Sequence, residues 1–124
     1  MDWLKNDVPG RGALIGVLAL ALLFAVGPLA VVAQDSFEDQ VANLKSPTAK
    51  TRQAAAKALG ESRRHEAVAP LSALVRDPEP KVRLEVVLAL TNLRDLAGVP
   101  ALVTSLQDGD PKVREQAISA LVEI

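Results

Sequence analysis

The feature that most constrains how this chain can fold is a short segment that recurs after 31 residues. The segment DPEPKVR at 77–83 returns as DGDPKVR at 108–114, and in a weaker form as SPTAKTR at 46–52. Apolar residues keep the same spacing on both sides of it: Leu44, Val75 and Leu106 before it, and Leu59, Leu90 and Leu121 after it. A fixed period of this length indicates a stack of structural repeats, an architecture typical of binding scaffolds.

From Phe37 onward the sequence predicts short α-helices separated by tight breaks. Polar segments at 61–66 and 94–98 connect one expected helix pair to the next. Pro80 and Pro111 suit a first helical turn, where proline removes no hydrogen bond. Proline-containing turns mark the middle of each pair: Ser46-Pro47, Asp77-Pro78 and 108–111. The expected pairs, each with a helix A followed by a helix B, are 36–45 with 48–60, 66–76 with 80–93, and 98–107 with 111–123.

The expected helices B carry an apolar stripe at helical spacing. In the second and third pairs the stripe comprises Val82, Val86, Ala89, Leu90 and Leu93, and Val113, Ala117, Ala120, Leu121 and Ile124. Alanine at 58, 89 and 120 should let neighbouring helices approach closely. One pair is too small to bury its own stripe, so three pairs must stack to form one core. We therefore expect an all-α fold, an α-solenoid with units at about 36–60, 66–93 and 98–124 in a domain at 34–124.

A different composition at the N-terminus predicts export from the cytoplasm. Residues 13–33 carry no charge, whereas Lys5 and Arg11 precede them. A Gly-Pro break at 27–28 and small residues at the end of the segment favour a signal peptide cleaved after Ala33. The alternative is an uncleaved N-terminal hydrophobic helix, because the segment is long enough to span ~30 Å of hydrocarbon as a membrane anchor. Both interpretations place the repeat domain outside the cytoplasm, either periplasmic or secreted, or anchored in the cytoplasmic membrane.

The repeated segment resembles the HEAT repeat family, in which helix A ends in leucine, an Asp-Pro turn follows, and Val-Arg precedes alanine and leucine on helix B. The resemblance covers roughly residues 37–124 and is closest to the short bacterial HEAT-like repeats of phycobilisome lyases. It is weaker in the first unit, where Ser46 and Thr51 replace aspartate and valine, as in a capping repeat. It implies a right-handed superhelical stack whose helices B line the concave side, the usual docking surface.

The resemblance also implies a structural ladder of aspartate and arginine side chains. In this interpretation Asp77 pairs with Arg83 and Asp108 with Arg114, while Arg52 holds the equivalent position in the first unit. Each aspartate would accept hydrogen bonds from arginine and from backbone N–H groups across adjacent turns. The alternative is that the arginines form a row of free hooks for phosphate or carboxylate groups.

Partner binding is expected on the side of the helices B that points away from the core. Periodicity places eight residues there: Gln53, Lys57, Leu84, Glu85, Leu88, Glu115, Gln116 and Ser119. Leu84 and Leu88 suggest a contact with helix A or with a partner, because two leucines at i, i+4 lie outside the main stripe. The last helix B is expected to leave an apolar side open, which monomers rarely do over a large contiguous patch. The stack is therefore expected to end against another molecule, such as a second copy that associates through this helix, or to be a fragment of a longer array.

The composition and motifs predict neither catalysis nor a cofactor. The chain has no cysteine, a formal net charge of −1 and one histidine, His65, which we expect in an exposed loop. These properties predict no metal cluster and no nucleic-acid partner. The expected function is a non-catalytic scaffold that binds a protein partner of unknown identity. Two alternatives are open: a membrane-tethered structural or regulatory module whose only membrane contact is 13–33, and, from the resemblance, a bilin-lyase-like enzyme subunit.

Overall fold

The computed structural model describes residues 36–124 of the chain. The predicted hydrophobic helix at 13–33 and the predicted cleavage after Ala33 lie outside these residues. All regular secondary structure in the described part is helical. None of its helices has the length and apolar composition that crossing a membrane requires.

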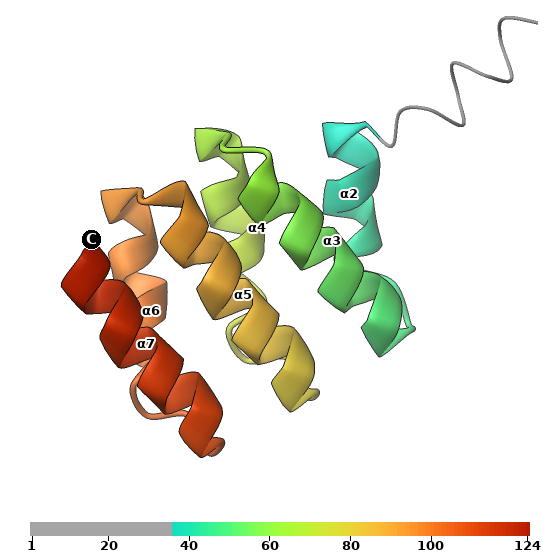
Figure 1. Ribbon diagram of the computed structural model, residues 1–124. Helices are drawn as coiled ribbons and strands as arrows, with labels where there is room; N and C mark the ends of the chain where they lie inside the picture. The colour runs from blue at the N-terminus through green and yellow to red at the C-terminus, as the bar shows by residue number, and fades with distance from the viewer. Residues whose placement is uncertain (1–35) are drawn as a thin grey trace, which may run out of the picture. The chain divides into compact units, whose positions relative to one another are not determined.

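Between Ser36 and Ile124, six α-helices form three consecutive pairs (Figure 1). In each pair helix A precedes a longer helix B: α2 (Phe37–Asn43) with α3 (Ala49–Glu61), α4 (Val68–Ser72) with α5 (Pro80–Leu93), and α6 (Val99–Ser105) with α7 (Pro111–Glu123). Single 3₁₀ turns at His65–Ala67 (η1) and Leu96–Gly98 (η2) lead into α4 and α6. This arrangement confirms the predicted all-α fold of helix pairs in a short solenoid.

The helices A are shorter than the sequence predicts. After α4 ends at Ser72, the chain keeps coiling through i→i+3 hydrogen bonds. The Leu74 N–H donates to the Leu71 carbonyl at 2.9 Å, and the Asp77 N–H donates to the Leu74 carbonyl at 3.0 Å. Such 3₁₀-like turns are common at helix ends and have nearly the same apolar spacing as an α-helix. Periodicity alone therefore extends the predicted helix too far.

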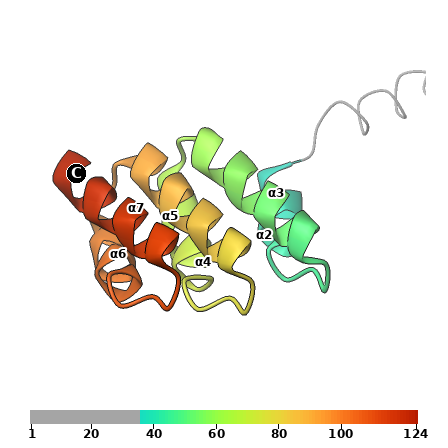
Figure 2. The same ribbon diagram turned by 60° about the horizontal axis from the view of Figure 1, so that its bottom comes forward.

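The helices B form one layer and the helices A a second layer behind it (Figures 1 and 2). Within the first layer α5 packs between α3 and α7, and each helix A packs against the helix B of its own pair. This nearest-neighbour packing is characteristic of solenoids, in which each repeat is stabilised by the units beside it.

A single core connects the three units. Val86 and Ala117, from the predicted stripes, are fully buried at 0% exposure. Burial of apolar side chains is the main source of stability in such a stack, at roughly 25 cal/mol per Å² removed from water. The largest fully buried apolar side chains come from helices of both layers: Leu59, Leu71, Leu90 and Leu102, with Val82, Val86, Val87 and Val113.

The closest helix approach that the glycines reveal is between α3 and α5. A Cβ atom added to Gly60 would lie 2.6 Å from the Cα of Ala89 and 2.7 Å from its Cβ. Both residues are buried. The alanine predicted to allow close approach at position 89 does so. The residue that it meets is Gly60, which was not part of the predicted apolar stripes.

Candidate partner-binding surface

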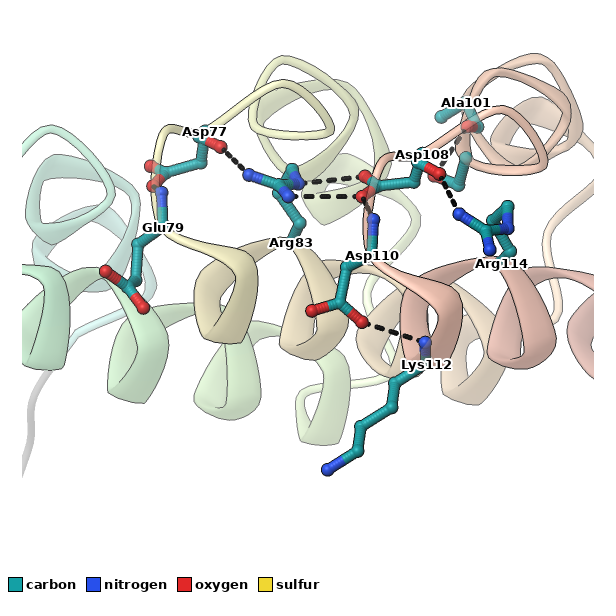
Figure 3. Close-up of polar contacts among 9 residues, drawn as sticks. Asp77, Glu79, Arg83, Ala101, Asp108, Asp110, Lys112 and Arg114 are labelled. Atoms are coloured by element: carbon teal, nitrogen blue, oxygen red, sulfur yellow. Dashed lines mark hydrogen bonds and ion pairs between the residues drawn. The ribbon is translucent and has the colours of Figure 1, made fainter.

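Two arginine–aspartate pairs join consecutive units of the stack. Arg52 on α3 donates from Nε to Asp77 Oδ2 at 2.8 Å and from Nη2 to Oδ1 at 3.2 Å. One unit later, Arg83 on α5 makes the same two bonds to Asp108, at 2.8 and 3.1 Å (Figure 3). Such two-pronged pairs are both strong and geometrically specific. They connect α3 and α5 to the turns of the helix pairs that follow them.

This connectivity corrects the pairing expected from the sequence. The carboxylate of Asp77 binds Arg52, whereas Arg83 reaches only the backbone carbonyl of Asp77, through Nη1 at 2.7 Å. Arg114 makes the same bond to the carbonyl of Asp108 at 2.7 Å. The reason is visible at Arg83, whose guanidinium lies between two turns: Nη1 faces the turn of its own pair, and Nε and Nη2 face the turn of the next unit (Figure 3).

The ladder carboxylates also organise the turns that they occupy. Asp77 Oδ1 accepts the N–H of Glu79 at 2.9 Å, and Asp108 Oδ1 accepts the N–H of Asp110 at 2.9 Å. Burial alone would raise the pKa of Asp108. The bonds from Arg83 and the Asp110 N–H outweigh burial and lower that pKa below its ordinary value. The carboxylate is therefore held in its charged form.

Arg52 and Arg83 are mostly buried and already bonded to aspartates, so their guanidinium groups are not available to other ligands. The side chains of Arg52 and Arg83 are 14% and 15% exposed, and their aspartate partners are 3% and 6% exposed. Arg114 differs, because within residues 36–124 it has no carboxylate partner. The alternative of a row of anion-binding arginines therefore does not fit Arg52 or Arg83, and among the three ladder arginines it leaves only Arg114.

The eight predicted contact residues all lie on the helices B, and none is fully buried. Because α3, α5 and α7 run side by side, equivalent positions on them form one continuous surface (Figure 2). We call this surface the B face; it comprises Gln53 and Lys57 on α3, Leu84, Glu85 and Leu88 on α5, and Glu115, Gln116 and Ser119 on α7.

The two leucines of the B face differ in their surroundings. Leu84 packs partly against the core, whereas Leu88 is partly exposed and is not among the side chains packed on the core. Leu84 also lines a groove of about 380 Å³ between the first turns of α5 and α7. Lys81 and Lys112 line the same groove. The B face therefore offers an apolar centre with charged groups beside it.

The acid at the centre of the B face, Glu85, has a pKa above its ordinary value. Partial burial raises the pKa of Glu85, the neighbouring Glu61 raises it further, and Lys57 opposes the shift. No cation lies within ion-pair distance of this carboxylate among residues 36–124. A partly desolvated acid without a direct partner would be stabilised by a cationic group brought by another molecule.

The sequence reasoning missed a second contact between units, at the opposite ends of the helices B. Nδ1 of His65 in η1 is bonded to Oδ2 of Asp95, the residue that precedes η2. Asp95 also accepts the N–H of Ala97 at 2.9 Å. The bond to Asp95 raises the pKa of His65. The only sequence indication of this contact was that both residues lie in connections between helix pairs, which become neighbours once the units stack.

A polar groove of about 470 Å³ lies near the same ends of the helices B. Arg63 and Arg94, which line it, have left-handed backbone conformations with φ of 55° and 50°. Glu61 and Glu123 line the same groove. Charges of both signs therefore offset one another there, and the arginines lie near helix C-termini, where positive charge is favourable.

These features define a helical repeat solenoid that belongs to the HEAT repeat family. The family model for HEAT repeats matches residues 38–124. A solved structure of human deoxyhypusine hydroxylase in complex with glycerol is similar, with 26% sequence identity and a TM-score of 0.66. The match covers 73% of this chain but only 32% of the hydroxylase chain. No curated protein matches the sequence. The narrower resemblance to phycobilisome lyases stays a prediction.

Proposed function

We propose that this protein is a non-catalytic scaffold that binds a protein partner on its B face. HEAT repeats generally mediate protein binding, and their stacked helices offer an extended surface for it. The observation that carries the proposal is the partly exposed apolar centre of α5, where Leu88 lies next to the charged Glu85. Binding would depend on shape and on charge complementarity, without turnover of a substrate.

The surroundings of the B face indicate the chemistry of the partner. The groove beside Leu84 would accept an apolar side chain, and the carboxylate of Glu85 would pair with a lysine or arginine. Apolar anchors inserted into pockets contribute most of the affinity of protein interfaces, and surrounding charges contribute specificity. The partner is therefore expected to present an apolar residue close to a basic one.

A triple change tests the B face. Together, Lys57→Glu, Glu85→Lys and Leu88→Glu replace the more exposed leucine of the B face by an acid and invert the charges at positions 57 and 85. Residues 34–124 carrying these changes should lose a partner that the unchanged domain captures from membrane and periplasmic extracts. The matched control is Val103→Glu on α6, because Val103 is an exposed apolar residue, at 50%, on the helix A layer. Circular dichroism checks that both variants stay helical.

Each outcome is decisive. Capture lost with the triple change and kept with Val103→Glu supports the B face. Capture that survives the triple change places the contact elsewhere on the molecule. If both variants stay helical and both lose the partner, the captured protein recognises general surface properties and not the B face.

We also propose that the repeat domain works outside the cytoplasm. The support is the uncharged segment 13–33, preceded by Lys5 and Arg11, which is typical of signal peptides and membrane anchors. N-terminal sequencing of the mature protein separates the two forms. A chain that begins at Gln34 supports cleavage, and one that retains 13–33 supports the membrane-tethered structural or regulatory module. A chain found only in the cytoplasm would contradict both.

A further inference from the structure

The turns between helix A and helix B carry a surplus of positive charge. The equivalent segments 45–52, 76–83 and 107–114 hold eight of the twelve basic residues between 36 and 124, but only four of the twelve acidic ones. Their formal net charge is therefore +4, and that of the other residues from 36 to 124 is −4. The ladder bonds to Asp77 and Asp108 hold successive turns side by side (Figure 3). We call this row of three segments the turn edge.

One lysine stands at the same position in each segment of the turn edge. Lys50, Lys81 and Lys112 are the second residues of α3, α5 and α7, and all three are exposed. A helix N-terminus favours acidic side chains and disfavours cations, and α2 accordingly carries Glu38 and Asp39 in its first turn. None of the three helices B has an acid in its first turn. The lysines therefore do not stabilise the helices that carry them.

These lysines are also not neutralised within the described part of the chain. None of them lies within ion-pair distance of a carboxylate among residues 36–124. Asp110 accepts the backbone N–H of Lys112 at 2.8 Å, while the side chain of Lys112 extends away from the ladder (Figure 3). Exposed charges of one sign along an edge attract opposite charges on another molecule.

An apolar groove lies between two of the three lysines. The groove of about 380 Å³ between the first turns of α5 and α7 is lined by Lys81 from one helix and by Lys112 from the other. Glu79 and Asp110 line it as well, so a continuous run of negative charge would be repelled there. Its apolar lining comes from Pro80, Leu84 and Val113. The groove therefore suits an apolar side chain with separate acids on either side of it.

We infer that the turn edge binds an extended segment of a partner protein in which acidic residues lie on both sides of an apolar one. The apolar side chain enters the groove, and the acids reach Lys81 and Lys112. Neighbouring helices lie ~8–10 Å apart, a distance that about three residues of extended chain span. Acids at about this interval therefore match the row of lysines, and Lys50 on α3 receives a further one.

The inference rests on the proposed function, because the groove beside Leu84 serves both. It adds an orientation to the partner. Lys81 precedes Leu84 on α5, and Glu85 follows it. The acids of the partner therefore face the turns, and its basic residue faces Glu85.

A peptide of defined charge tests the turn edge. The full chain in a non-ionic detergent is titrated with a short fluorescent peptide in which glutamates flank one leucine, and anisotropy measures the Kd. Lys81→Gln with Lys112→Gln should raise the Kd about threefold to tenfold, the loss expected for two exposed ion pairs. The matched control is Arg63→Gln with Arg94→Gln, which removes the same charge from the other groove. Equal Kd values for the two double variants would overturn the inference, as would a peptide that does not bind the unchanged chain.

Changes in the probe separate the groove from general attraction between charges. Serine in place of the leucine should weaken binding, and lysines in place of the glutamates should abolish it. A peptide that binds equally well without its leucine would show that charge alone is recognised, and would overturn the inference. So would displacement of the peptide, at equal negative charge, by a short DNA strand or by phosphatidylglycerol added to the micelles, because the edge would then bind nucleic acid or lipid.

The two double variants and the triple change of the B face distinguish this inference from the proposed function. If the triple change abolishes capture of the partner while the lysine substitutions alter neither capture nor peptide binding, the proposed function stands and the turn edge is refuted. If the lysine substitutions weaken peptide binding while the triple change leaves capture intact, the turn edge is supported and the B face is refuted.

Discussion

Asp77→Ala is the change that most directly tests how the units are held together. It removes both carboxylate bonds of Arg52 and the acceptor of the Glu79 N–H. The Arg52 side chain is only 14% exposed, so water replaces the lost carboxylate poorly. Breaking one partner of a buried pair costs about 3–5 kcal/mol. Since the total unfolding free energy of a small domain is about 5–15 kcal/mol, this single change should remove a large share of the stability.

Denaturant unfolding followed by circular dichroism measures this loss. The matched control is Asp110→Ala, because Asp110 accepts the N–H of Lys112 at 2.8 Å at an exposed helix start. Loss of such a cap costs about 1 kcal/mol. A cycle with Arg52→Ala should show that the double change costs at least about 1 kcal/mol less than the sum of the single changes. If Asp77→Ala costs no more than Asp110→Ala, or if the two changes at the pair are additive, the ladder does not hold the stack.

Three further predictions concern packing and pH. Gly60→Ala should lower the unfolding free energy by about 1–3 kcal/mol through overpacking, whereas Gly109→Ala should be tolerated, since an added Cβ there meets nothing within 4 Å; thermal unfolding of the two variants decides this. The raised pKa of His65 implies stabilisation that is complete below about pH 6.5 and lost as the pH rises through the pKa of the folded state. The unfolding free energy measured against pH should show this loss in the unchanged chain, and Asp95→Asn should abolish it. The lowered pKa of Asp108 implies stabilisation that is present above its ordinary pKa and lost as the pH falls through the pKa of the folded state. Asp108→Asn should reduce the loss of unfolding free energy at acid pH. An unchanged loss would mean that other groups cause it.

The sequence period predicted the fold because it reports the one constraint that every unit shares. Positions such as Val86 and Ala117 recur at the same place in the pattern, and both are fully buried. The period could not predict which aspartate binds which arginine. Arg83 has the same sequence relation to the ladder as its counterparts, so a partner in its own turn and a partner in the next unit fit the pattern equally well. Only the spatial order of the units separates them.

Two other features depended on contacts that no repeat pattern contains. His65 aligns with Leu96 one period later, so the alignment gives no reason to pair it with Asp95. On the B face, Leu84 and Leu88 are one helical turn apart, and periodicity assigns them to the same side. Their different burial arises from the neighbouring helices, because Leu84 lies beside the first turn of α7 and Leu88 is not packed on the core.

The weak attachment of α2 affects how the molecule would respond to mechanical load. None of its seven residues is buried, and its turn carries Ser46 where the other turns carry an aspartate bonded to arginine. A pulling force applied upstream of Ser36 would therefore detach α2 first, while α3 stays fastened to the next unit through Arg52. The N-terminal end of the stack would act as a compliant joint that yields before the rest of the array does.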